Sequence, residues 1–169
     1  MLEHTPGPEQ DTRSALRWLW LAMLVVILDQ ASKQWAEAVL PQGQIELVSW
    51  FNFTLAYNRG AAFSFLADAG GWQRFFFLGI GLVAVVVITL WLRRLRADET
   101  QNAIGLALIL GGAIGNLIDR ALYGYVVDFV DWHYGDWHWP AFNLADAAIL
   151  LGAVLVVLAG LRGGKERAA

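Results

Sequence analysis

Residues 102–122 read NAIGLALILGGAIGNLIDRAL, and this stretch decides the fold class of the chain. It carries no charged side chain before Asp119. A helix of roughly 20 apolar residues is long enough to cross the hydrocarbon core of a bilayer. The stretch therefore predicts a transmembrane helix with a polar end. Within it, Gly111 and Gly115 form a GxxxG step, which favours close helix packing in lipid.

Three further apolar blocks accompany this one along the chain. With it, they predict four spans at about 15–34, 72–92, 102–122 and 141–161. The composition agrees, because 57% of the residues are apolar and only 16% are charged, whereas soluble domains average about a quarter charged. We therefore expect an all-α membrane protein with one four-helix domain over residues 15–162. Polar tails at 1–14 and 163–169 would flank this domain.

The first apolar block is expected to stay in the protein as a span rather than be removed as a signal peptide. The triplet Ala-Glu-Ala at 36–38 has the small-x-small pattern of a cleavage site. However, Asp29, Gln30 and Lys33 lie between the apolar run and that triplet. This polar interval is too long for a leader, so we interpret the block as uncleaved.

The long loop over residues 39–71 is predicted to contain short strands. Several prolines, glycines and asparagines interrupt any long helix there. Apolar residues alternate in places with polar ones between Ile45 and Leu55, which is typical of strands. We expect a small β-rich region on the membrane surface, where residues 39–57 could support a site and 60–66 could cover it.

The distribution of basic residues predicts the orientation. Eight of the twelve basic residues fall on one side of a four-span path: Arg13, Arg17, Arg93, Arg94, Arg96, Arg162, Lys165 and Arg167. The positive-inside rule then places both termini in the cytoplasm. The loops at 34–71 and 123–140 would lie on the periplasmic or outer side, where their many Trp and Tyr residues suit the headgroup interface.

Polar residues gather at the outer ends of the predicted spans. They are Asp29, Lys33, Asn58, Arg59, Asn116, Asp119, Arg120, Asp128, Asn143 and Asp146. Ionisable residues in spans are costly and mark candidate functional sites. The pairs Asp29–Lys33 and Asp119–Arg120 either neutralise each other in lipid or contact a substrate. One polar site near the outer surface is the natural inference.

Two carboxylates have no basic residue at helical spacing, Asp128 and Asp146. Two such groups in a low-dielectric site can share a proton, which is the arrangement of aspartic peptidases. The rival carboxylates Asp131 and Asp136 lie inside the loop, and we expect both to be solvated. We interpret the loop histidines at 133 and 138 as interfacial residues. The chain has no cysteine, which excludes thiol catalysis and disulfides.

Five motifs give the chain a family resemblance. They are LDQASK at 28–33, NRGAAFS at 58–64, GGAIGNLIDR at 111–120, VVDF at 126–129 and FNLADAAI at 142–149. In order and spacing the chain resembles the lipoprotein signal peptidases, also called signal peptidase II. The resemblance implies catalysis by Asp128 and Asp146. It also implies that six further residues support the site or bind substrate: Asn58, Asn116, Arg120, Asn143, Asp29 and Lys33.

The same resemblance implies a substrate and a location. The substrate would be a bacterial prolipoprotein whose cysteine carries diacylglycerol, cut just before that cysteine in the cytoplasmic (inner) membrane. It implies inhibition by the cyclic peptide globomycin and no cofactor or metal. We expect a monomer surrounded by membrane lipid. The Trp- and His-rich segment at 132–139 departs from the family, in a stretch that varies within it.

Two other functions remain open from the residues alone. One is a metal-dependent lipid-headgroup transferase, because Asp119, Gly124, Asp128 and Asp131 loosely match its aspartate pattern. The other is a proton-coupled transporter that uses buried carboxylates. A net charge of −3 argues against nucleic acid as a partner.

Overall fold

The computed structural model describes residues 15–60 and 70–166. The predicted tail at 1–14, most of the predicted cover at 60–66 and the last residues of the C-terminal tail lie outside the described residues.

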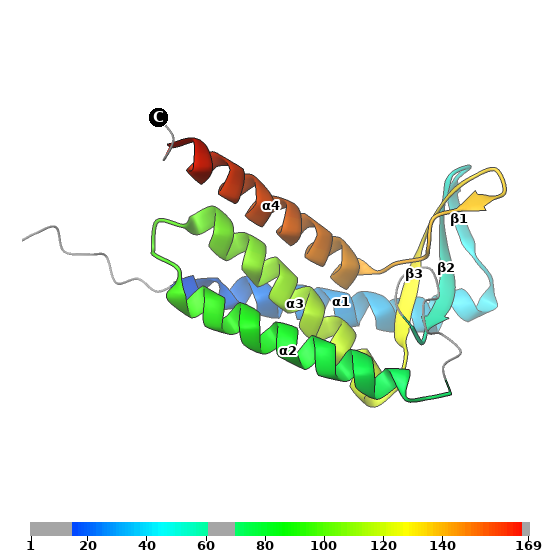
Figure 1. The fold of residues 1–169 in the computed structure, drawn as a ribbon. Coiled ribbons are helices and arrows are strands. Elements are labelled where there is room, and N and C mark those ends of the chain that lie inside the picture. The colour runs from blue at the N-terminus through cyan, green and yellow to red at the C-terminus, as the bar shows by residue number, and fades with distance from the viewer. Residues whose placement is uncertain (1–14, 61–69, 167–169) are drawn as a thin grey trace, which may run out of the picture.

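Four long helices form the body of the molecule (Figure 1). They are α1 (Leu19–Val39), α2 (Gln73–Arg94), α3 (Thr100–Leu122) and α4 (Leu144–Glu166). All four are long and apolar enough to cross a membrane. The 3-10 turn Ala15–Trp18 leads into α1, and a second, Leu40–Gln42, follows it. The first helix thus continues beyond residue 34, the end expected from its sequence.

The outward faces of these helices are apolar. Phe75 and Val83 on α2 are 72% and 63% exposed, and Leu150 on α4 is 68% exposed. Such a continuous apolar exterior suits lipid rather than water. The prediction of an apolar four-helix protein is therefore confirmed.

Helix α3 lies at the centre because its small residues admit its neighbours. A side chain at Gly111 would meet the carbonyl of Ala22 in α1 at 2.7 Å, and one at Gly105 would meet the carbonyl of Gly152 in α4 at 2.8 Å. Such contacts leave no room for any Cβ, so the GxxxG step does serve helix packing. Leu106 and Leu110 of α3 pack with Leu92 of α2 in the main apolar core.

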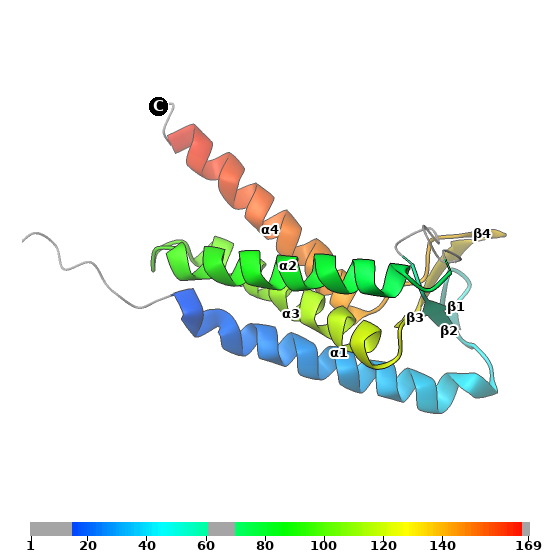
Figure 2. The ribbon, with the colours of Figure 1, turned by 60° about the horizontal axis from the view of Figure 1, so that its bottom comes forward.

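A four-stranded antiparallel sheet lies at one end of the bundle (Figures 1 and 2). Its strands are β1 (Ile45–Val48), β2 (Phe51–Asn58), β3 (Val126–Tyr134) and β4 (Trp137–His138), in that order. The β2–β3 register pairs Phe51 with Trp132 and Asn58 with Val126.

The strand prediction was right for the first loop and incomplete for the second. Strands β1 and β2 include the region between Ile45 and Leu55 where alternation predicted them, and β2 continues to Asn58. The longest strand, β3, comes instead from residues 123–140, which we expected only as a loop. Its sequence VVDFVDWHY is rich in β-branched and aromatic residues, which favour strands. Pairing with β2 brings the second loop back to the ends of the helices.

Candidate active site

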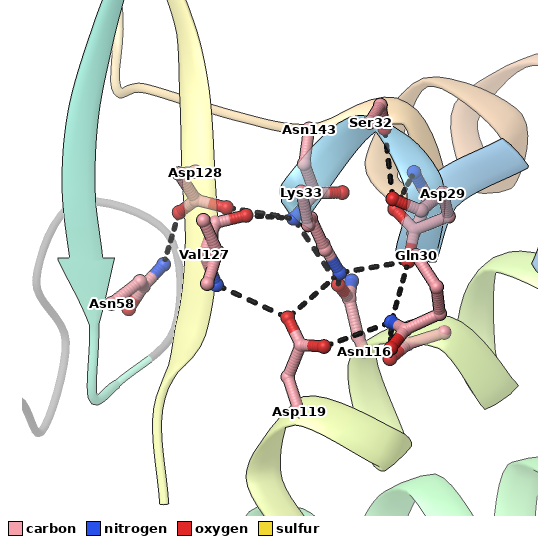
Figure 3. A network of polar contacts seen from close by, with 12 residues as sticks. Asp29, Gln30, Ser32, Lys33, Asn58, Asn116, Asp119, Val127, Asp128 and Asn143 are labelled. Carbon is pink, nitrogen blue, oxygen red and sulfur yellow. Dashed lines mark hydrogen bonds and ion pairs between the residues drawn. The ribbon is translucent and has the colours of Figure 1, made fainter. Parts of the chain in front are cut away.

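Polar side chains from α1, α3, β2 and β3, together with Asn143 just before α4, meet where the helix ends reach the sheet (Figure 3). The meeting point is buried, since Asp29, Asp128 and Asn143 are each 2% exposed or less. Each of these groups must therefore find its hydrogen bonds within the protein.

Asn143 begins α4 and ties its first turn together with Asp146. The Asn143 Oδ1 atom accepts the backbone N–H of Asp146 at 2.9 Å. In return, Asp146 Oδ2 accepts the backbone N–H of Asn143 at 3.3 Å. This reciprocal pair is a capping box, which satisfies two helix-end donors at once. It fixes the Asp146 carboxylate at the N-terminal end of α4.

Asp128 is held on β3 by two amide donors. Asn143 Nδ2 donates to its Oδ1 atom at 2.7 Å, and Asn58 Nδ2 on β2 donates to its Oδ2 atom at 3.1 Å (Figure 3). Burial, followed by the nearby charge of Asp146, raises the pKa of Asp128 to about 7. The amide donors act in the opposite direction but do not offset these effects. Asp128 is therefore poised to hold or release a proton near neutral pH.

Asp146 receives a matching donor from α3. Asn116 Nδ2 donates to Asp146 Oδ1 at 2.8 Å. Asn143 binds both aspartates, Asp128 through its side chain and Asp146 through its backbone. A single residue, Asn143, thereby fixes the buried carboxylate of Asp128 and the partly buried carboxylate of Asp146 in one site.

Lys33 is the buried cation beside these groups. Its Nζ atom contacts Asp29 Oδ2 at 2.8 Å, Asp119 Oδ2 at 2.9 Å and Asn116 Oδ1 at 3.0 Å. An ammonium has three donors, so this environment uses all of them. Because Lys33 faces the oxygen of Asn116, the amide nitrogen of Asn116 must face Asp146. Lys33 thus sets the orientation of the Asn116 amide, which donates to Asp146.

The carboxylate of Asp29 connects three helices. Its Oδ1 atom accepts the backbone N–H of Ala145 in α4 at 3.0 Å, and its Oδ2 atom accepts Gln30 Nε2 at 3.2 Å. Gln30 also donates to Asp119 Oδ1 at 2.9 Å. A Cβ at Gly115 would collide with Asp29 Oδ2. The second glycine of the GxxxG step therefore makes room for a buried charge as well as for a helix.

Arg120 is a second cation near the two aspartates. Its Nη2 atom donates to the Gly60 carbonyl at 2.9 Å, and its guanidinium stacks 5.1 Å from the Phe77 ring centre. Asp146 and Asp128 lie close enough for their negative charges to attract the Arg120 guanidinium. Arg74 of α2 caps the end of α3 by donating to the carbonyls of Arg120 and Ala121 at 2.9 and 2.6 Å.

The structure brings the predicted site residues to one place, with two corrections. The expected Asp119–Arg120 pair is replaced by the Asp119–Lys33 ion pair, because Asp119 points toward α1. The Asp29–Lys33 pair is present. The expectation of a solvated Asp131 is wrong.

Asp131 is buried because the pairing of β3 with β2 and β4 brings Asn52 and His138 against its carboxylate. It is 6% exposed, and its Oδ1 atom lies 2.8 Å from His138 Nδ1. Asn52 Nδ2 approaches its other oxygen at 3.5 Å. Asp136, by contrast, is exposed as predicted.

Sequence reasoning also missed Gln30 and Arg74 as parts of this region. Gln30 lies within the first motif, so its polar side chain in an otherwise apolar span was the available signal. Within the described ranges, His, Asp and Glu side chains form no group of three or more that could hold a metal ion.

Comparison with known proteins decides the family. The model of the family described as signal peptidase (SPase) II matches residues 21–162. The chain belongs to the signal peptidase II family. The resemblance seen in the motifs is thereby confirmed, and with it the assignment as an aspartic-type peptidase. The alternatives of a headgroup transferase and a transporter receive no support from these matches.

Relatives and solved structures agree with this family. The chain is 52% identical over 143 residues to a lipoprotein signal peptidase of Cellvibrio japonicus, covering 83% of this chain and 84% of that protein. It is 50% identical over 162 residues to one of Pseudomonas aeruginosa, covering 94% and 96%. A bacterial membrane enzyme solved by the in meso method has a TM-score of 0.77 at 28% identity, with 89% and 90% of the two chains covered. The family and the four candidate spans together indicate that this chain is a multi-pass membrane protein.

Proposed function

We propose that this signal peptidase II removes the signal peptide from diacylglyceryl-modified bacterial prolipoproteins, using Asp128 and Asp146 as its catalytic pair. The observation that carries the proposal is the single asparagine, Asn143, that binds both carboxylates, the buried Asp128 and the partly buried Asp146. A lipoprotein precursor as substrate agrees with the relatives, which are lipoprotein signal peptidases, and the diacylglyceryl group is what the family resemblance implies.

The chemistry uses one proton between the two aspartates. Asp128, whose pKa lies at about 7, holds the proton and donates a hydrogen bond to the scissile carbonyl oxygen. Asp146, as the carboxylate, accepts a proton from the water that attacks the carbonyl carbon. The tetrahedral intermediate collapses when the C–N bond breaks, and the leaving amine takes from Asp146 the proton that came from water. The signal peptide then leaves with a free carboxylate, and the lipidated cysteine keeps the new amine.

The neighbouring polar groups orient the pair and the substrate. Asn58 donates to the Asp128 carboxylate, and Asn116 donates to the Asp146 carboxylate. Arg120 supplies a positive charge beside both. The Arg120 guanidinium reaches the backbone at Gly60, where a substrate chain would approach. Asp29 and Lys33 act through other residues. Lys33 fixes the Asn116 amide, and Asp29 fixes the start of α4 by accepting the Ala145 N–H.

The lipid on the substrate accounts for a site at the membrane surface. A diacylglyceryl cysteine would keep its acyl chains in the bilayer, beside the apolar outer faces of the helices. Each buried CH₂ contributes roughly 0.8 kcal/mol, so an unlipidated precursor would bind far more weakly.

We also propose that both termini are cytoplasmic and that the sheet and active site face the periplasmic side of the inner membrane. Arg17, Arg93 and Arg162 belong to the end of the bundle away from the sheet, as the positive-inside rule requires. The sheet instead exposes aromatic residues such as Trp50 and Trp137, at 56% and 62%. A reporter fused after Ala169 should be cytoplasmic, and one inserted near Gly43 should be external.

The proposal includes inhibition by globomycin and action as a monomer, and it needs no metal. The test is cleavage in detergent of one prolipoprotein with and without its diacylglyceryl group, each with globomycin or a chelator. We expect rapid release of signal peptide from the lipidated substrate, loss of release with globomycin, and no effect of the chelator. Equal rates on both substrates would refute lipid recognition, and loss of activity with the chelator would refute the aspartate mechanism.

A further inference from the structure

A groove opens between α3 and α4 at the end of the bundle away from the sheet. Its volume is about 470 Å³, and its lining consists of Thr100, Gln101, Ile104, Leu155, Leu158 and Arg162. Figures 1 and 2 both show α4 diverging from the other helices toward its C-terminal end. The groove therefore lies where two membrane-spanning helices separate.

The groove begins where close helix contact ends. At Gly105 and Gly152 the two helices touch, because a Cβ at Gly105 would meet the Gly152 carbonyl at 2.8 Å. Toward this end from the contact, Ile104 of α3 and Leu155 and Leu158 of α4 form apolar walls. Leu158 is 41% exposed, so the walls continue directly into the lipid-facing surface of α4.

A charged side chain is held at the mouth of the groove. Gln101 Nε2 donates to the Leu155 carbonyl at 2.9 Å, which fixes the Gln101 amide across the two helices. Its Oε1 atom then accepts Arg162 Nη1 at 2.9 Å. A guanidinium has five N–H donors, so this single bond orients Arg162 and leaves donors for an anion.

We propose that this groove binds one anionic phospholipid, with its phosphate on Arg162 and one acyl chain along Ile104, Leu155 and Leu158. The occupant is lipid because the walls are continuous with the apolar surface that the spans present to the bilayer. It is anionic because the described residues at the same end of the bundle include Arg17, Arg93, Arg94, Arg96 and Lys165 besides Arg162, against Asp98, Glu99 and Glu166. Basic pockets between transmembrane helices are suited to anionic headgroups. The inference rests on the membrane spans and is independent of the peptidase chemistry.

The test measures lipid binding to the full-length purified protein in detergent by native mass spectrometry. The probes are dioleoylphosphatidylglycerol, dioleoylphosphatidylcholine and, as a headgroup without chains, glycerol phosphate. We expect the wild type to bind phosphatidylglycerol more tightly than phosphatidylcholine. Arg162→Gln should weaken phosphatidylglycerol binding about fivefold, the ratio that corresponds to about 1 kcal/mol per basic residue. Binding of phosphatidylcholine should weaken less, because its choline cation offsets the charge of the phosphate.

Three further variants make the result specific. Arg94→Gln, at the same end but on α2, should leave the affinity unchanged, and Arg162→Lys should retain most of it. Leu158→Trp, which fills the groove, should weaken binding of both lipids. Retained signal-peptide cleavage shows that each variant is folded, because the groove is remote from the aspartates. Equal losses for Arg162→Gln and Arg94→Gln, equal binding of the two lipids, or displacement by glycerol phosphate would each overturn the proposal.

Discussion

Asp128→Asn should change the pH dependence of stability in a defined direction. Burial and the charge of Asp146 raise the pKa of Asp128 from 3.8 to about 7 in the folded protein. A raised carboxyl pKa means that folding disfavours ionisation of Asp128. The folded state therefore loses stability as pH rises from about 4 to about 7, and the loss is complete above that range.

The magnitude follows from the size of the shift. A change of roughly 3 pKa units corresponds to about 4 kcal/mol, at about 1.4 kcal/mol for each unit. Asp128 is 2% exposed, so solvent screens this effect little. Asparagine cannot ionise and escapes the loss. However, both oxygens of Asp128 accept amide donors, from Asn143 and Asn58, and an amide nitrogen would oppose one of them.

In the Asp128→Asn variant, an amide nitrogen would face a hydrogen-bond donor, and this mismatch would lower the free energy of unfolding by about 1–3 kcal/mol at every pH. Asp128→Asn should thus be about 1–3 kcal/mol more stable than the wild type at pH 8 and less stable by a similar amount at pH 4. Between those limits, the difference in unfolding free energy should change by about 1.4 kcal/mol for each pH unit. The crossing of the two stability curves does not depend on the absolute stability of either protein.

The assay is SDS-induced unfolding in detergent at several pH values, followed by circular dichroism. Asp136→Asn is the matched control, because Asp136 is an exposed carboxylate on the same hairpin. Its stability should differ little from that of the wild type, as is usual for a substitution at an exposed position. Parallel curves for the wild type and Asp128→Asn would refute the reasoning, since they would show that Asp128 ionises as easily in the folded protein as in the unfolded one.

Three further outcomes follow from the site. Gly115→Ala should cost about 1–3 kcal/mol in the same unfolding assay, since its methyl group overpacks a buried carboxylate, whereas Gly79→Ala, with open space around it, should not destabilise. Lys33→Met should cost about 3–5 kcal/mol because it leaves two buried carboxylates without their cation, and adding Asp119→Asn should restore part of that loss. In steady-state assays, kcat/KM should be bell-shaped with pH, and its alkaline limb should have a midpoint near 7, where Asp128 ionises.

The helices could be predicted because lipid imposes a strong constraint on sequence. A span such as residues 102–122 has almost no freedom to be anything else, since its polar backbone must be satisfied internally. The position of α3 at the centre was also visible in part, through Gly111 and Gly115. That Gly115 faces Asp29 could not be seen, because the spacing of glycines says nothing about which neighbour arrives.

Strand β3 had a local signal, because VVDFVDWHY is rich in β-branched and aromatic residues, but its partner and the burial of Asp131 could not be predicted from local sequence. Both depend on pairing with β2, which lies about 70 residues earlier in the chain. Without that partner, Asp131 has no reason to be buried. The identity of a non-local partner strand leaves little signal within either segment.

Part of the candidate site could be predicted from the sequence. The spacing Asn143-x-x-Asp146 before an apolar run is a capping-box signature and could have linked these two residues directly. The Lys33–Asp119 ion pair could not, because helical spacing made Asp29 and Arg120 the obvious partners. A buried cation selects its partners in three dimensions, from helices whose relative rotation the sequence does not state.

The central claim is that Asp128 and Asp146 act as one catalytic unit. The most direct test is the cleavage rate of a diacylglyceryl-modified prolipoprotein by Asp128→Asn, Asp146→Asn and the double variant, each purified free of the host peptidase. Asp131→Asn is the control, because Asp131 is a buried aspartate on the same strand but outside the pair. We expect each single variant to lose activity on the order of 10⁴-fold, the double variant to be little worse, and the control to remain active. Substantial cleavage by either single variant, or additive losses in the double variant, would contradict the account.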